Sequence, residues 1–180
     1  MKLSFLHDVY CPKKGKEVYP EELYLEMKKY QLKNDRTAKV NIPADYEVGK
    51  AGTFTSRIFS DPMEGLPFDI EVDSLKKAPS IQLDAQYSRP KNAWDGPGIV
   101  GRFTLNTCGV SRTSGNFKIR PLWKKITASG VELELFEGSF SLDITYSSLY
   151  KRKGHGSGIN CPEVPFWGIR SYDWARNAIC

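Results

Sequence analysis

The stretch VELELFEGSFSLDITY, residues Val131 to Tyr146, decides the fold class. Apolar and polar residues alternate on both sides of Glu137-Gly138, which is typical of strands with one face on a core and the other in water. Glycine tolerates the positive φ of tight hairpin turns, so we predict a turn at Glu137-Gly138. In the register that this turn sets, each apolar residue lies opposite another apolar residue. A second turn at Ala128-Ser129-Gly130 would complete a three-stranded meander.

The same period of two recurs along the chain from about residue 38. Phe68 to Asp73 and Ile81 to Ser88 alternate strictly, which predicts two half-buried strands. The remaining predicted strands lie within Lys2 to Tyr10, Thr53 to Phe59, Ile99 to Asn106 and Phe117 to Lys125. Many short strands separated by Gly, Pro and Asn are typical of an antiparallel β-sandwich or a β-barrel. The pattern alone does not choose between them.

One short N-terminal α-helix is predicted over Pro20 to Lys33. Proline suits the first turn, where its missing N–H is not needed, and Glu21 and Glu22 suit the positive end of the helix dipole. Leu23, Met27 and Tyr30 recur at helical spacing. The sequence therefore predicts a mainly β protein with a single helix.

Length and composition predict one folded domain over residues 1–180. The chain has 180 residues, of which 40% are hydrophobic and 26% charged, as in ordinary globular proteins. No apolar run approaches the roughly 20 residues needed to cross a bilayer, and the opening residues lack a signal-peptide core, so we expect a cytoplasmic protein. The cysteines are widely spaced, which favours free thiols, although their even number leaves disulfides open: Cys11, Cys108, Cys161 and Cys180.

The charge balance favours anionic partners without requiring them. Lys and Arg number 26 against 21 Asp and Glu, for a net charge of +5. The final stretch combines basic residues with aromatic rings that could stack on bases, so we take it as the candidate binding surface: Lys151, Arg152, Lys153, Trp167, Arg170, Tyr172 and Trp174. The alternative is that the rings pack against the sheet.

Glu132 and Asp143 are the candidate catalytic residues. In the predicted meander they lie opposite each other, where two carboxylates could transfer protons or hold a hard cation. The alternative is a solvated outer face, with Lys124 close to Glu134. If the protein is a barrel enzyme, its pocket walls would include Tyr87, Trp94, Trp123 and Tyr146.

Histidine chemistry would depend on His7 and His155, each of which has a cysteine nearby, Cys11 and Cys161. Neither spacing matches a standard zinc motif, and no third group is available to orient a histidine–cysteine pair, so we predict no metal and no cofactor. The glycines around His155 are read as a flexible connector.

Three function classes follow from these observations. The first is a non-catalytic binding or structural domain that recognises a protein, an anionic surface or nucleic acid. The alternatives are a cofactor-independent β-barrel enzyme of the isomerase or cyclase type, and a carrier of a small apolar ligand. The sequence leaves enzyme against binding protein, and the oligomeric state, undecided.

Overall fold

The computed structural model describes residues 1–5, 17–33, 37–83 and 89–170, and the side chains of residues 2–5 and 37 are not among the described ones. In chain order, the helices and strands are β1 (Lys2–Phe5), α2 (Pro20–Lys33), β2 (Thr37–Asn41), η1 (Tyr46–Val48), β3 (Gly52–Ser56), β4 (Ile70–Ala78), β5 (Gly98–Thr104), β6 (Val110–Ile126), β7 (Glu132–Tyr146), α3 (Ser148–Arg152) and β8 (Gly158–Ile169). The mainly β class and the helix over Pro20–Lys33 are confirmed.

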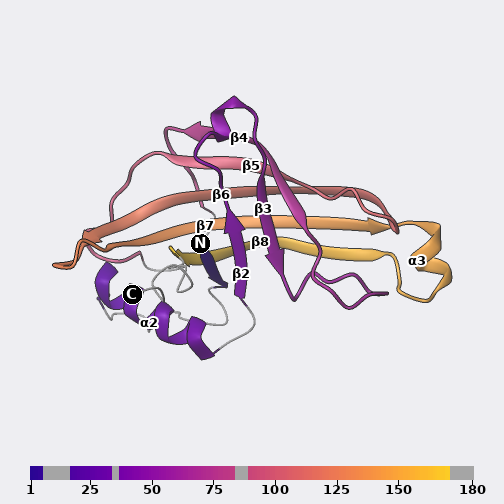
Figure 1. The fold of residues 1–180 in the computed structure, drawn as a ribbon, viewed down its shortest axis with the longest axis horizontal. Coiled ribbons are helices and arrows are strands. Elements are labelled where there is room, and N and C mark those ends of the chain that lie inside the picture. Colours follow the sequence, from indigo (N-terminus) through magenta and orange to yellow (C-terminus); the bar gives the residue numbers. More distant parts are fainter. Residues whose placement is uncertain (6–16, 34–36, 84–88, 171–180) are drawn as a thin grey trace.

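The strands form one strongly curled antiparallel sheet in chain order, and the short β1 pairs with both β2 and β8. This pairing closes the sheet into a barrel, so the barrel alternative holds rather than the sandwich. Figure 1 shows β6, β7 and β8 running side by side along the molecule, with β2 and β3 lying across them.

The predicted turn at Glu137-Gly138 is wrong, because β7 runs straight through it. Gly138 pairs with Ile119 on β6 and Phe166 on β8. A Cβ atom there would lie 2.2 Å from the Lys118 carbonyl oxygen and 2.3 Å from the Phe166 ring. The glycine therefore serves close packing in mid-strand and not a turn.

The other predicted turn, at Ala128-Ser129-Gly130, is confirmed. It joins β6 to β7, with Ile126 opposite Glu132, and Gly130 has a φ of +77°. The predicted approach of Lys124 to Glu134 is confirmed too, since the two residues pair across the strands.

Two further differences concern segments outside the long strands. Residues 81–83 belong to no strand, so that part of the predicted strand over Ile81 to Ser88 is wrong, and residues 84–88 lie outside the described ones. Lys151 and Arg152 end the short helix α3, which begins at Ser148, and Lys153 is its C-cap. Ser147 is the N-cap, and its side chain accepts a hydrogen bond from the Leu149 N–H. Sequence analysis predicted no helix there.

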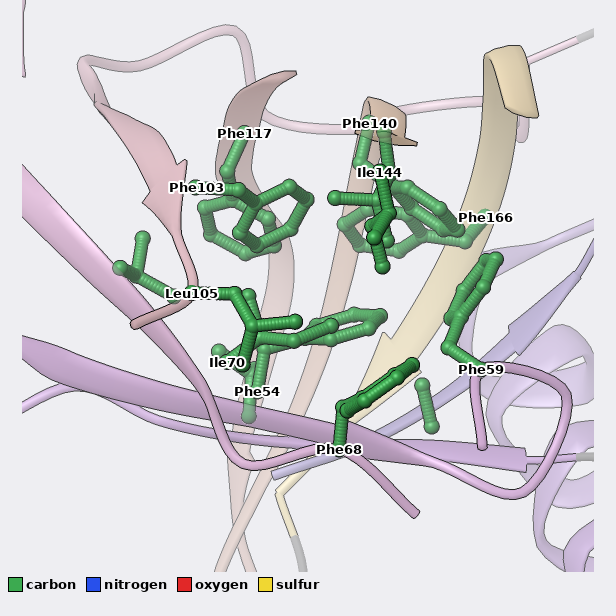
Figure 2. Close-up of a cluster of buried hydrophobic side chains, with 14 of the residues drawn as sticks. Phe54, Phe59, Phe68, Ile70, Phe103, Leu105, Phe117, Phe140, Ile144 and Phe166 are labelled. Carbon is green, nitrogen blue, oxygen red and sulfur yellow. The ribbon is translucent and has the colours of Figure 1, made fainter. Parts of the chain in front are cut away.

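Phenylalanine rings fill the barrel interior (Figure 2). Phe140 lies at their centre, with ring centroids 5.3 Å from Phe54, 5.9 Å from Phe59 and 6.0 Å from Phe103. All four side chains are buried. Rings at these distances gain both from burial and from edge-to-face contacts. Over the described residues, the centre of the barrel is therefore packed with aromatic side chains.

A second, smaller core lies between α2 and the outer face of the sheet. Its buried members include Leu23 and Met27 of α2, Leu135 of β7 and Trp167 of β8. Residues 135 and 140, an odd and an even position of the same strand, thus belong to different cores. Strand β7 and its neighbours β6 and β8 therefore contribute side chains to both cores.

Helix α3 is attached to the barrel through Tyr150, which is buried. Its hydroxyl donates to Asp61 Oδ2 at 2.5 Å and lies 3.1 Å from the Cys108 carbonyl oxygen. The hydrogen bond to Asp61 raises the pKa of Tyr150 to about 12. Burial alone would raise the pKa of Asp61, but hydrogen bonds from Tyr150 and from the Met63 and Glu64 N–H groups outweigh it and lower that pKa.

Replacing Tyr150 by phenylalanine is expected to lower the free energy of unfolding by about 1–2 kcal/mol, because a hydrogen bond to a charged group is lost. Since the folded protein keeps the Tyr150 proton more tightly than the unfolded chain, its contribution is full below pH 10 and is lost as pH rises toward 12. Urea unfolding at several pH values measures both effects. Tyr19→Phe, at an exposed tyrosine, is the control. An equal alkaline loss of stability in Tyr150→Phe and the unmodified protein would contradict the assignment.

Candidate functional site: a groove across β4, β5 and β6

Three cationic side chains meet on the outer face of three adjacent strands. Lys76 of β4 lies opposite Val100 of β5, which lies opposite Lys118 of β6. Arg102 lies two residues from Val100 and therefore on the same face. Lys76, Arg102 and Lys118 line a hollow of about 410 Å³ with Ser74, Val100, Gly101, Asn116 and Phe117.

A β-bulge in β4 puts Lys76 on this face. The register shifts by one residue between Asp73 and Lys76, and Ser74 has a φ of +50°. Ile70 and Val72 point into the barrel, so strict alternation would also point Lys76 inward. The extra residue of the bulge reverses the phase and turns the lysine outward.

A second hollow of about 770 Å³ adjoins the first, since Lys118 lines both. Its other walls are Arg120 of β6, the segment 79–83, and Asp95 and Gly96. We call the two hollows together the β4–β6 groove. The Trp94 indole, 54% exposed, lies against Gly96, where a Cβ atom would be 2.2 Å from the ring. An exposed aromatic face thus borders the groove.

The cations of the groove differ in how far they are neutralised. Lys118 Nζ lies 3.2 Å from Glu163 Oε1, and the same oxygen accepts from Ser139 Oγ at 2.5 Å. That hydrogen bond from Ser139 is the main cause that lowers the pKa of Glu163. Within the described part of the chain, Lys76 and Arg102 have no acidic partner within 4.0 Å. Asp73 lies opposite Arg102 in the β4–β5 register but accepts a hydrogen bond from Thr104, so neither Lys76 nor Arg102 is held in an ion pair among the described residues.

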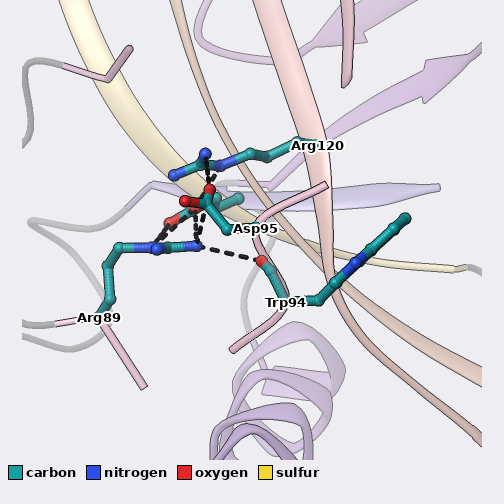
Figure 3. Close-up of polar contacts among 5 residues, drawn as sticks. Arg89, Trp94, Asp95 and Arg120 are labelled. Atoms are coloured by element: carbon teal, nitrogen blue, oxygen red, sulfur yellow. Dashed lines mark hydrogen bonds and ion pairs between the residues drawn. The ribbon is translucent and has the colours of Figure 1, made fainter. Parts of the chain in front are cut away.

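A charge cluster around a buried carboxylate lies beside the second hollow, and Figure 3 shows its contacts. Glu137 is fully buried, and its Oε1 lies 2.6 Å from Arg120 Nε and 2.9 Å from Arg89 Nη2. Arg120 also pairs with Asp95, and Arg89 Nη2 donates to the Trp94 carbonyl oxygen at 3.2 Å. Arg120 is therefore neutralised. The cluster ties residues 89–95 to the sheet and so fixes one wall of the groove.

No protein-family model, curated protein or solved structure matches this chain. The candidate site consequently depends on the geometry alone. None of the helices over the described residues has the length and apolar character needed to span a membrane.

The binding surface predicted from the sequence is not one surface. Lys151, Arg152 and Lys153 are exposed at the α3 end of β8, and Arg170 follows its other end. The twelve residues of β8 separate them by roughly 35 Å. Trp167 is fully buried beneath α2 and offers no face to a ligand, so the packing alternative holds for this ring. Tyr172 and Trp174 lie outside the described residues.

The predicted opposition of Glu132 and Asp143 is also wrong. Both lie on β7, eleven positions and about 36 Å apart, because no turn folds the strand back. Asp143 accepts from Asn160, whereas Glu132 pairs with Lys124. Hydrogen bonding to Lys124 is the main cause that lowers the pKa of Glu132. The two carboxylates share no site.

The remaining candidates are scattered. Tyr146 is buried in the barrel core, Trp123 is half-buried beside α2, and Tyr87 lies outside the described residues. His155 packs edge-on against Tyr150, with centroids 6.0 Å apart. Burial raises the pKa of the Cys161 thiol, which makes it a poor nucleophile.

The structure also bears on the cysteines and on metal binding. Cys108 and Cys161 are free, in agreement with the favoured interpretation, while His7, Cys11 and Cys180 lie outside the described residues. Residues 1–5, 17–33, 37–83 and 89–170 contain no group of three His, Cys, Asp or Glu side chains arranged to hold a metal ion.

Proposed function

We propose that this protein is a non-catalytic binding domain that takes a single-stranded nucleic acid in the β4–β6 groove. One observation carries the proposal: Lys76, Arg102 and Lys118, from three adjacent strands, line one hollow, and two of them have no acidic partner among the described residues. Cations arranged this way neutralise the phosphates of a nucleic-acid backbone.

The form of the site supports a strand-like ligand. The groove is concave and continues from Arg102 to Gly96, which suits an extended chain better than a flat membrane surface. Ser74, Asn116 and Gln82 add neutral hydrogen-bonding groups of the kind that contact phosphate and sugar. The exposed Trp94 indole at the rim offers a face for base stacking, which is tolerant of sequence.

The proposed setting is a reducing compartment such as the cytoplasm. The free thiols Cys108 and Cys161 support it, since unpaired cysteines persist where disulfides are reduced. The packed interior argues against a carrier of a large apolar ligand within the barrel.

The test compares two variants in binding a fluorescent single-stranded oligonucleotide, measured by anisotropy from low to moderate salt. Lys76→Ala/Arg102→Ala is expected to weaken binding about tenfold or more, and to lower the slope of log affinity against log salt by about 0.7 per lost phosphate contact. The matched control is Lys151→Ala/Arg152→Ala/Lys153→Ala. It removes three positive charges instead of two, at the α3 end of β8, and is expected to leave oligonucleotide binding nearly unchanged.

Three results would overturn the proposal. One is a larger loss of oligonucleotide affinity in the control variant than in Lys76→Ala/Arg102→Ala, which would place the binding site at α3. Another is the absence of binding at low salt. The third is binding of polyglutamate as tight as that of the oligonucleotide, which would identify an acidic protein as the partner.

A further inference from the structure

A third hollow lies at the end of the barrel, where β6 and β7 extend toward their shared turn. Its volume is about 410 Å³, and its walls are apolar side chains that also pack against the barrel core, among them Ile42, Ile99, Ile119 and Phe136. We call it the mouth hollow. Apolar concavities of this size with a few polar groups at the rim are typical of small-molecule sites.

Two polar groups of the rim face each other. Glu134 of β7 is only 12% exposed, and its Oε2 lies 2.8 Å from Arg170 Nε. Glu132 and Lys124 lie beside it, with Lys124 Nζ 4.0 Å from Glu134 Oε1. Burial raises the pKa of Glu134, and the neighbouring Glu132 adds to the effect, while Arg170 and Lys124 oppose it. Glu134 is therefore the carboxylate with which a ligand would compete for the Arg170 guanidinium.

The charges that line the mouth hollow favour an anion. Among the residues that the structure describes, Lys77, Arg120 and Arg170 line it together with one acid, Glu134. Lys77 is held by Glu47 at 2.8 Å, and Arg120 is held by Glu137. Arg170, which is 53% exposed, is the cation that a ligand entering the hollow can engage. A guanidinium receives a carboxylate through two parallel hydrogen bonds.

We propose that the mouth hollow binds a small apolar molecule bearing one carboxylate. The apolar part would lie against Ile99, Ile119 and Phe136, and the carboxylate would pair with Arg170. The mouth hollow adjoins the β4–β6 groove at Arg120, which lines both. Its apolar walls and Arg170 lie outside the groove, so binding at the two sites can be tested separately.

Calorimetric titration of the full chain with octanoate and with octanol tests the proposal, because the two probes share a chain and differ in charge. Octanoate is expected to bind at least tenfold more tightly. Arg170→Ala should abolish that preference and leave octanol binding unchanged. Glu134→Gln should strengthen octanoate binding, since it removes the competing carboxylate.

Ala44→Trp places a large ring at an exposed position on the hollow and should block both probes. Lys76→Ala/Arg102→Ala is the control, and it should leave both titrations unchanged. Equal binding of octanoate and octanol, or binding that survives Ala44→Trp, would overturn the proposal. So would the absence of octanoate binding at millimolar concentration. None of these results bears on oligonucleotide binding.

Discussion

Replacing Glu137 by leucine is expected to destabilise the protein by about 3–5 kcal/mol. The carboxylate is fully buried and neutralises Arg120, whose side chain is only 10% exposed, together with Arg89. Removing the acid leaves a buried guanidinium without its main counter-charge, which costs far more than the intact pair contributes. Urea unfolding followed by circular dichroism measures the loss.

A second variant separates the cost of leaving the Arg120 guanidinium unpaired from the cost of lost packing. Glu137→Leu/Arg120→Met removes both members of the buried pair, and it should recover most of the stability, since apolar replacements of such pairs are often neutral. Asp95→Asn alters an acid that is 68% exposed and should cost less than about 1 kcal/mol. A cost below about 1 kcal/mol for Glu137→Leu, or no recovery in the double variant, would contradict this account.

Phe140→Ala is expected to cost about 3–5 kcal/mol. The ring is 1% exposed and packs against Phe54, Phe59, Phe103 and Phe166, which come from different parts of the barrel. Truncation leaves a cavity that rigid strands cannot close, and the cost grows with the cavity that remains. Thermal and urea unfolding check the value.

Phe140→Leu is the matched control for that variant. It keeps most of the apolar volume and should cost much less. If both variants cost the same, the loss would come from disturbed backbone rather than from a cavity.

Much of the fold follows from local pattern. The helix over Pro20–Lys33 has a favourable start and a regular apolar spacing, and the turn at Ala128-Gly130 needs only a glycine with positive φ. Both are decided by neighbours in the sequence, so both could be predicted. The alternation around Ile70 and Val72 likewise matches their burial inside the barrel.

The error at Glu137-Gly138 has a definite cause. Along β7 the apolar positions change from odd, at Leu133 and Leu135, to even, at Phe140 and Leu142. A turn explains such a change of phase, but so does a straight strand whose two ends are covered on opposite faces. The second explanation is the correct one, because α2 covers the odd side and the barrel encloses the even side. Sequence pattern does not distinguish them.

The candidate groove could not be predicted for a related reason. Lys76, Arg102 and Lys118 meet only through the register of three strands, and the bulge at Ser74 decides the side on which Lys76 lies. Conversely, the proximity of Lys151 and Arg170 to the same aromatic stretch suggested one surface, but an extended strand carries them to opposite ends. Helical or looped chain between them would have kept them close.

Strand β7 lies between β6 and β8, and all three contribute side chains to both cores. Neither hydrophobic layer can be completed until β7 has found its register, and closure further requires Lys2 of β1 to meet Ile169 of β8. Contacts so distant along the chain must overcome a large loop-closure entropy before they contribute stability. We therefore expect late, non-local events to govern folding, and we expect the helix and the barrel to unfold together rather than to open separately.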